Sequence, residues 1–138
     1  EPNDFLAACA RELPPRSRIL CLGEGEGRNA VHLAALGHRV TAVDQSAVGL
    51  TKAAALARTR RAGLTTLVAD LASFEIHPGT WDAVILIFLH LEPGLRTSVL
   101  GRAAAGLAPG GSLILEAYAP EQVRFRTGGP VGAPELLV

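Results

Sequence analysis

Three glycines at alternate positions, Gly23, Gly25 and Gly27, follow an apolar run that begins at Ile19. Glycines directly after a strand let the backbone N–H groups approach a ligand closely, because no side chain stands in the way. A dinucleotide-binding loop would place its third glycine one position later, and that position holds Arg28. The G-x-G-x-G spacing therefore predicts a ligand-binding loop and counts against a pyrophosphate ligand.

Two aspartates follow the next two apolar runs. Asp44 ends the second run, where a carboxylate can accept hydrogen bonds from both hydroxyls of a ribose. Asp70 ends the third, in the stretch LVADL, where a carboxylate can accept from the exocyclic amine of an adenine. Alone, either residue could simply end a strand or begin a turn. Together with the glycine loop, they predict a nucleoside pocket without a phosphate-binding group.

The chain between these positions alternates between strand-like and helix-like segments. Strands are expected at 18–22, 39–43, 65–69, 82–89 and 112–117, and helices at 4–13, 28–36, 47–61 and 93–107. The continuous apolar run 82–89 is typical of a strand that is buried on both faces of a parallel sheet. The alternation predicts an α/β fold with a doubly wound, mostly parallel sheet, which binds ligands at the carboxyl ends of its strands.

Capping residues support these helix limits. Asn3 and Ser46 are expected to cap the first and third helices, because short polar side chains accept hydrogen bonds from the first free N–H groups. Gly37 and Gly63 are expected to end the second and third helices in the left-handed conformation. The region 71–80, which contains Pro78 and Gly79, is expected to be a loop.

Composition narrows the function classes. The chain has 138 residues, of which 49% are apolar, and a formal net charge of zero, so we expect a single globular domain. The charge balance favours neither nucleic acid nor a membrane surface as a partner. The longest charge-free apolar run, 83–91, is too short to span a bilayer, and the start EPNDF does not resemble a signal peptide. Cys9 and Cys21 are expected to be reduced, buried residues, so we expect a cytoplasmic protein.

The stretch GEGEGRN, together with Asp44 and Asp70, resembles the Rossmann-like (class I) S-adenosylmethionine-dependent methyltransferases. It is similar in particular to the tellurite-resistance methyltransferase branch, and the resemblance covers roughly residues 3 to 130. It implies S-adenosyl-L-methionine as the cofactor, with the loop backbone at the methionine part, Asp44 at the ribose and Asp70 at the adenine amine. The cofactor-binding residues expected on this basis are Gly23, Glu24, Gly25, Gly27, Arg28, Asn29, Asp44, Gln45, Asp70 and Leu71.

The chain departs from the family pattern at two points. The family usually has an acid two residues before the first glycine, where this chain has Cys21, and two acids, Glu24 and Glu26, stand inside the loop instead. One of them is expected to bind the methionine ammonium through a charge-assisted hydrogen bond. The family's sheet usually has seven strands, the last two forming an antiparallel hairpin. We therefore expect a C-terminally incomplete methyltransferase domain that lacks the last strands.

The predicted reaction is methyl transfer to a small-molecule acceptor by alignment-driven in-line displacement. Alignment and desolvation of the nucleophile supply most of the rate enhancement, so a dedicated base is not required. His90, after the fourth strand, and Tyr118, after the fifth, are the candidate catalytic residues. His90 could instead only end its strand, and Tyr118 could serve packing alone. The N-terminal helix could cover the cofactor or pack against the sheet.

Two further segments have no assigned chemistry. Arg124, Arg126 and the loop 127–130 could form a substrate-side loop or an ordinary surface loop. The remaining histidines, His32, His38 and His77, lack ligand-like spacing, so no metal site is expected.

Two other functions remain open from the sequence. A nicotinamide-dependent oxidoreductase would share the glycine loop and Asp44, although the loop spacing and Asp70 count against it. A non-catalytic module that binds a nucleoside cofactor would fit a domain without its last strands.

Overall fold

Five parallel strands form a single sheet in the order β3-β2-β1-β4-β5. The computed structural model describes residues 1–125. The strands are β1 (Arg18–Leu22), β2 (Arg39–Asp44), β3 (Leu64–Val68), β4 (Trp81–Ile87) and β5 (Leu107–Glu116). The helices are α1 (Asp4–Ala10), α2 (Arg28–Ala35), α3 (Ala47–Thr59), α4 (Pro93–Gly106) and the 3-10 helix η1 (Pro120–Arg124). The predicted doubly wound parallel sheet is confirmed, and the strand order reverses between β1 and β4.

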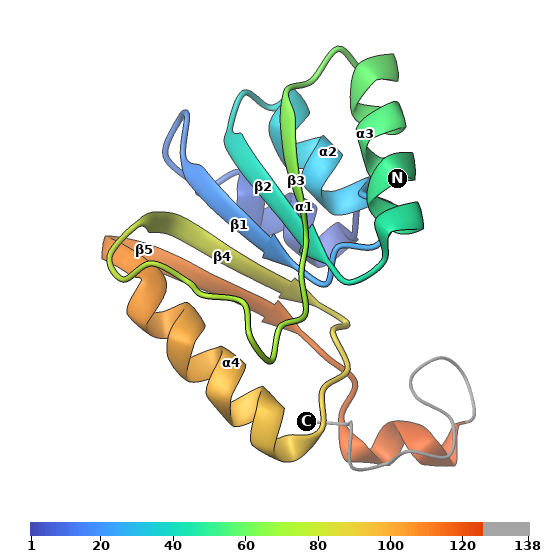
Figure 1. Cartoon of the computed structure of the whole chain (residues 1–138), viewed down its shortest axis with the longest axis vertical. Coiled ribbons are helices and arrows are strands. Elements are labelled where there is room, and N and C mark those ends of the chain that lie inside the picture. Colours follow the sequence, from blue (N-terminus) through green and yellow to red (C-terminus); the bar gives the residue numbers. More distant parts are fainter. Residues whose placement is uncertain (126–138) are drawn as a thin grey trace.

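Each face of the sheet has its own apolar core. On one face, α1, α2 and α3 pack against the sheet through residues such as Leu6, Leu33 and Leu50. On the other face, α4 contributes Val99 and Ala103, and covers β4 and β5 (Figure 1). Residues of one strand alternate between the two cores, which requires a strand buried on both faces.

Side chains cap the helices largely as predicted. The side-chain oxygen of Asn3 accepts a hydrogen bond from the N–H of Leu6 at 2.9 Å, and the hydroxyl of Ser46 accepts from the N–H of Gly49 at 3.0 Å. Gly37 ends α2 with φ 95°. The prediction that Gly63 ends α3 in the left-handed conformation was wrong, because Arg61 adopts that conformation instead, with φ 53°.

Some element limits differ from the predicted ones. Helix α1 ends at Ala10 rather than at residue 13, and residues 11–13 continue in turns. Strand β5 begins at Leu107 rather than at residue 112, because Leu107 pairs with Trp81 before an irregularity in the register. Residues 109–111 are therefore part of an irregular strand. Arg126 and the loop 127–130 lie outside the described residues.

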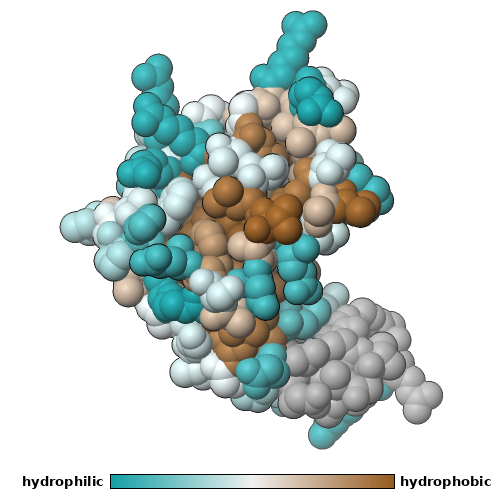
Figure 2. Space-filling view, in the orientation of Figure 1, coloured by the Kyte–Doolittle hydropathy of each residue, from teal (hydrophilic) through white to brown (hydrophobic). Residues whose placement is uncertain are grey.

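The connection between β3 and β4, residues 69–80, crosses the sheet as a loop rather than as a helix (Figure 1). The α4 side of β2 and β3 is consequently less covered than the rest of the sheet. Apolar surface appears in the middle of the molecule in the same orientation (Figure 2), and Leu67 of β3 is 43% exposed. Within the part of the chain that the structure describes, the helices are too short or too polar to cross a bilayer.

Candidate cofactor and acceptor site

A cavity of about 270 Å³ lies at the carboxyl ends of β1 to β4, beside the point where the strand order reverses. In an open parallel sheet this is the position at which ligands bind. Its lining residues are Gly23, Asp44, Gln45, Ala69, Asp70, Leu71, Leu89, His90, Leu91, Glu92 and Leu95. Three acids, one imidazole and several apolar side chains thus surround one hollow, a composition typical of a small-molecule site.

Asp44 connects the end of β2 to the glycine loop. Its Oδ2 accepts a hydrogen bond from the N–H of Gly25 at 2.8 Å, and its Oδ1 accepts from the N–H of Ser46 at 2.8 Å. Each carboxylate oxygen has a second lone pair, so both can still accept from a ligand hydroxyl. Asp44 therefore both shapes the loop and presents acceptor atoms to the cavity.

Asp70 begins the β3–β4 loop, and its own backbone and side chain fold that loop. Its Oδ1 accepts from the N–H of Ala72 at 2.9 Å, and its carbonyl accepts from the N–H of Phe74 at 2.8 Å. From α4, the Arg102 guanidinium donates to the carbonyl of Leu71 at 2.6 Å and to the carbonyl of Phe74. This two-point contact holds the loop, and with it Asp70, against the rest of the fold.

Each of the three loop glycines lies in a different environment, so a side chain at each position would have a different effect. A Cβ on Gly23 would clash with the side chain of Leu89, which lines the cavity. A Cβ on Gly27, which has φ 88°, would clash with Ala53 and lie 2.8 Å from its Cα, so this glycine allows α2 and α3 to pack closely. Beside Gly25, with φ 61°, nothing lies within 4 Å of the Cβ position. The open space beside Gly25 leaves room for a ligand against the loop backbone.

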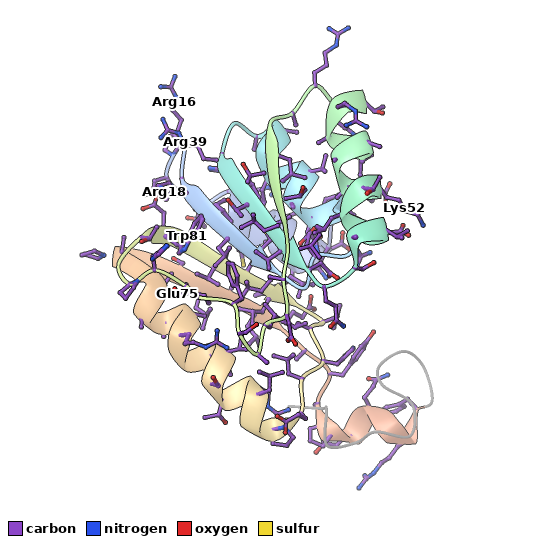
Figure 3. All side chains as sticks on the ribbon, in the orientation of Figure 1. Arg16, Arg18, Arg39, Lys52, Glu75 and Trp81 are labelled. Atoms are coloured by element: carbon purple, nitrogen blue, oxygen red, sulfur yellow. The ribbon has the colours of Figure 1, made fainter. Side chains whose placement is uncertain are left out.

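The two glutamates of the loop point in different directions. Glu26 forms an exposed ion pair with Lys52 of α3 at 2.7 Å, and Lys52 points away from the sheet (Figure 3). Glu24 turns inward, and its Oε1 accepts from the N–H groups of Asn29 at 3.0 Å and Ala30 at 2.7 Å at the start of α2.

Burial controls the protonation of Glu24. Desolvation raises its pKa to about 7, against the lowering effect of its two backbone hydrogen bonds and of Arg28. The negative charge of Asp44 raises it further. The same burial, with a contribution from Glu24, raises the pKa of the Cys21 thiol. Glu24 is thus a carboxyl group that a nearby cation could ionise.

An aromatic stack joins the segments that follow β4 and β5. The rings of Phe88 and Tyr118 are stacked with centroids 4.5 Å apart, and those of His90 and Tyr118 are 5.8 Å apart. Phe88 has φ 50°, a conformation that a bulky residue rarely adopts. This turn after β4 accompanies the placement of Leu89 against Gly23 and of His90 in the cavity lining.

The structure brings together half of the predicted site. The predicted residues that line the cavity are Gly23, Asp44, Gln45, Asp70, Leu71 and His90. The others surround it without lining it: Glu24 and Gly25 lie in the loop, Gly27, Arg28 and Asn29 begin α2, and Tyr118 stacks on His90. Sequence reasoning missed Ala69, Leu89, Leu91, Glu92 and Leu95. The signal available for Ala69, Leu89 and Leu91 was their place soon after β3 or β4, whereas Glu92 and Leu95 belong to the start of α4.

Asn29 does not line the cavity but connects α2 to the start of α1. It is buried, and its Oδ1 accepts from the backbone N–H of Asn3 at 2.8 Å. Asn3 in turn donates from its side chain to Glu116 at the end of β5, at 2.7 Å. The start of α1 is therefore fastened both to α2 and to β5, beside the ends of the strands.

The strand order, the glycine loop after β1 and the acids after β2 and β3 together define the Rossmann-like, class I methyltransferase fold. The chain belongs to the methyltransferase domain family, whose sequence profile matches residues 19–111. No curated protein matches the chain significantly.

Solved structures with the same fold come from several organisms. The PH0226 protein from Pyrococcus horikoshii OT3 is 25% identical, with a TM-score of 0.77, and the match covers 87% of this chain and 57% of that one. The CcbJ methyltransferase from Streptomyces caelestis is 26% identical, with a TM-score of 0.77 and coverages of 94% and 55%. TehB from Haemophilus influenzae, at 21% identity, shares the fold with a TM-score of 0.78 and coverages of 88% and 43%. The chain thus spans about half the length of the structures it matches.

Proposed function

We propose that the chain binds S-adenosyl-L-methionine and takes part in transferring its methyl group to a small-molecule acceptor. The observation that carries the proposal is the single cavity that Asp44 and Asp70 line from the ends of neighbouring strands, beside the glycine loop. Asp44 supplies acceptors for the ribose hydroxyls, and Asp70 supplies an acceptor for the adenine amine. Leu71 and Leu95 provide apolar surface for the adenine ring.

The methionine part of the cofactor fits the open space beside Gly25. Of the two candidate acids for its ammonium group, Glu24 is favoured, because it turns inward and its carboxyl group accepts from the first N–H groups of α2. Glu26 is already paired with Lys52 on the exposed side of the loop. An ammonium next to Glu24 would offset the desolvation of the carboxylate and lower its pKa from about 7.

When bound, the cofactor would supply a methyl group on a sulfonium sulfur, and this sulfur would leave as a neutral thioether. The chain's own contribution is to hold the reacting groups in line and to keep water out. Leu89 and Leu91 exclude water at the cavity wall, and His90 lies within the lining, where it can accept a proton from an acceptor. Tyr118 orients the His90 ring by stacking.

Calorimetric titration of the chain with S-adenosylhomocysteine tests the cofactor assignment. The informative variant is Asp44→Asn, which removes the charge and part of the acceptor capacity at the ribose position. Asp82→Asn is the matched control, since it makes the same change at the opposite, amino end of the sheet. We expect saturable binding that weakens at least tenfold in Asp44→Asn, about 1.4 kcal/mol, and is unchanged in Asp82→Asn.

A parallel titration with NADH separates this proposal from an oxidoreductase. NADH binding that depends on Asp44, in the absence of binding to S-adenosylhomocysteine, would favour the nicotinamide alternative. Binding of S-adenosylhomocysteine without methyl transfer to any acceptor would favour a non-catalytic module. Equal affinity in the two aspartate variants would refute the ribose assignment.

A further inference from the structure

A second hollow lies at the opposite edge of the sheet, at the amino ends of β1 and β2. It measures about 680 Å³ and is open to solvent. Among its lining residues, those with polar or aromatic side chains are Arg18, His38, Arg39, Thr41, Thr65 and Trp81. We call this hollow the basic groove. Figure 3 shows Arg39 and Arg18 at the edge from which the strands start, with Arg16 on the same side.

Two arginines stand side by side in the basic groove. Arg18 of β1 and Arg39 of β2 are register partners in the parallel ladder. Partners in a parallel ladder project to the same face, and their strands are about 4.8 Å apart. The pair therefore places two positively charged side chains on the same face of adjacent strands, an arrangement that costs stability unless a negative group offsets the charge.

The described part of the chain pairs no acidic side chain with either guanidinium. Among residues 1–125, no carboxylate oxygen lies within 4.0 Å of the Arg18 or Arg39 guanidinium. The neighbouring acid, Asp82, directs its Oδ2 to the backbone N–H of Arg18 at 2.8 Å. The side-chain charges of the pair are thus available to a ligand.

Packing fixes one member of the pair. The Arg18 guanidinium carbon lies 5.6 Å from the centroid of the Trp81 ring, a cation–π distance. Trp81 begins β4 and packs into the core under α4, so the ring is a rigid support. A guanidinium held in this way loses less conformational entropy when it forms a bidentate contact.

Three other polar side chains of the groove, His38, Thr41 and Thr65, can also donate hydrogen bonds. The Nδ1 atom of His38 accepts a hydrogen bond from the backbone N–H of Ser17 at 3.1 Å, so the neutral ring carries its proton on Nε2. Burial lowers the pKa of His38, which keeps the ring neutral. Thr41 and Thr65, register partners on β2 and β3, add hydroxyl groups.

We propose that the basic groove binds an oxyanion, a phosphate or carboxylate group of a ligand, between the guanidinium groups of Arg18 and Arg39. Planar guanidinium groups recognise such anions through paired N–H···O contacts. A five-residue strand separates the groove from the cofactor cavity, a length of about 17 Å. The oxyanion site is therefore distinct from the methyl-transfer site and is independent of its assignment.

Titration of the ¹⁵N-labelled chain with inorganic phosphate, followed by NMR, tests this proposal, with citrate in parallel to distinguish phosphate from carboxylate. We expect saturable shifts of the Thr41 and Thr65 amides. The double variant Arg18→Gln/Arg39→Gln is expected to weaken binding at least tenfold. The control Arg11→Gln/Arg58→Gln removes two exposed arginines elsewhere and is expected to leave the affinity unchanged.

A variant that should bind the anion more tightly tests the proposal even if the arginine variants lose binding because they misfold. Asp82→Asn keeps an acceptor for the Arg18 N–H but removes the neighbouring negative charge, so the affinity for the anion is expected to rise severalfold. Non-saturable shifts, or an equal loss of affinity in the two double variants, would mean that phosphate only screens the net charge, and would overturn the proposal. Unchanged affinity in Asp82→Asn would also contradict it. Titration with S-adenosylhomocysteine should be unaffected by all of these substitutions.

Discussion

Replacement of Glu24 by glutamine is expected to stabilise the chain at alkaline pH while weakening its cofactor site. The pKa of Glu24 rises in the folded chain from 4.5 to about 7, chiefly through desolvation. The folded state therefore holds this proton more tightly than the unfolded state does. Stability from this group is fully present below about pH 4.5 and is lost as the pH rises through about 7.

The size of the effect follows from the shift. A change of about 2.5 pKa units corresponds to about 3 kcal/mol at most, and partial solvent access reduces the effect to about 1–3 kcal/mol. Glutamine keeps an oxygen that can accept from the N–H groups of Asn29 and Ala30, and it carries no charge. At pH 8 the Glu24→Gln variant is therefore expected to be more stable than the wild type by this amount. Near pH 4.5 the two proteins should be equal.

Urea denaturation of both proteins at pH 5 and pH 8 measures this difference. Glu26→Gln is the matched control, because its exposed ion pair with Lys52 contributes at most about 1 kcal/mol. A Glu24→Gln variant that is less stable than the wild type at pH 8, or that follows the same pH profile, would refute the reasoning about burial.

The Glu24→Gln variant also tests whether Glu24 binds the ammonium group of the cofactor. If the methionine ammonium lies beside Glu24, binding at pH 7 releases a proton from the wild type, because a nearby cation lowers the pKa of the carboxyl group. Calorimetry in buffers of different ionisation enthalpy measures this proton release. The release should vanish in Glu24→Gln and persist in Glu26→Gln. Its absence from the wild type would exclude Glu24 as the ammonium partner.

Two further substitutions test the scaffold of the site. Gly27→Ala is expected to destabilise the chain by more than about 2 kcal/mol, because its Cβ would meet the Ala53 backbone. Gly25→Ala places its Cβ in open space and is expected to cost only about 1–2 kcal/mol, from the strain of a left-handed backbone. Equal urea midpoints for the two variants would contradict the packing argument. Arg102→Ala is expected to cost about 2 kcal/mol, because it removes two charge-assisted hydrogen bonds to the β3–β4 loop. Hydrogen exchange at the Phe74 amide should then accelerate, and unchanged protection would show that the loop holds itself.

The fold was predictable because short apolar segments alternate with helix-like segments, and glycine, proline or capping residues separate them. The acids Asp44 and Asp70 could be placed together from the sequence, since parallel strands end at one edge of the sheet. The helix limits were less certain: Arg61, not a glycine, takes the left-handed position after α3. Local sequence favours glycine there but does not require it, because tertiary packing can hold a non-glycine residue in that conformation.

The apolar part of the site was not predictable in the same way. The positions of Leu89 and Leu91 depend on the turn at Phe88, whose positive φ has no sequence signature in a phenylalanine. The direction of Glu24 likewise depends on where α2 begins relative to the loop. The basic groove required knowledge of register, since Arg18 and Arg39 are far apart in sequence and meet only across the ladder.

The hydrogen bonds of Asp44 have a consequence for the thermodynamics of recognition. Both of its oxygens accept from backbone N–H groups, which fix the rotamer of this side chain. Under the proposed assignment, a ribose would meet acceptors that need no reorganisation, and little side-chain entropy would be lost on binding. Because one of those bonds comes from Gly25, any movement of the glycine loop also displaces the acceptors. Affinity for the sugar and order in the loop should therefore rise and fall together.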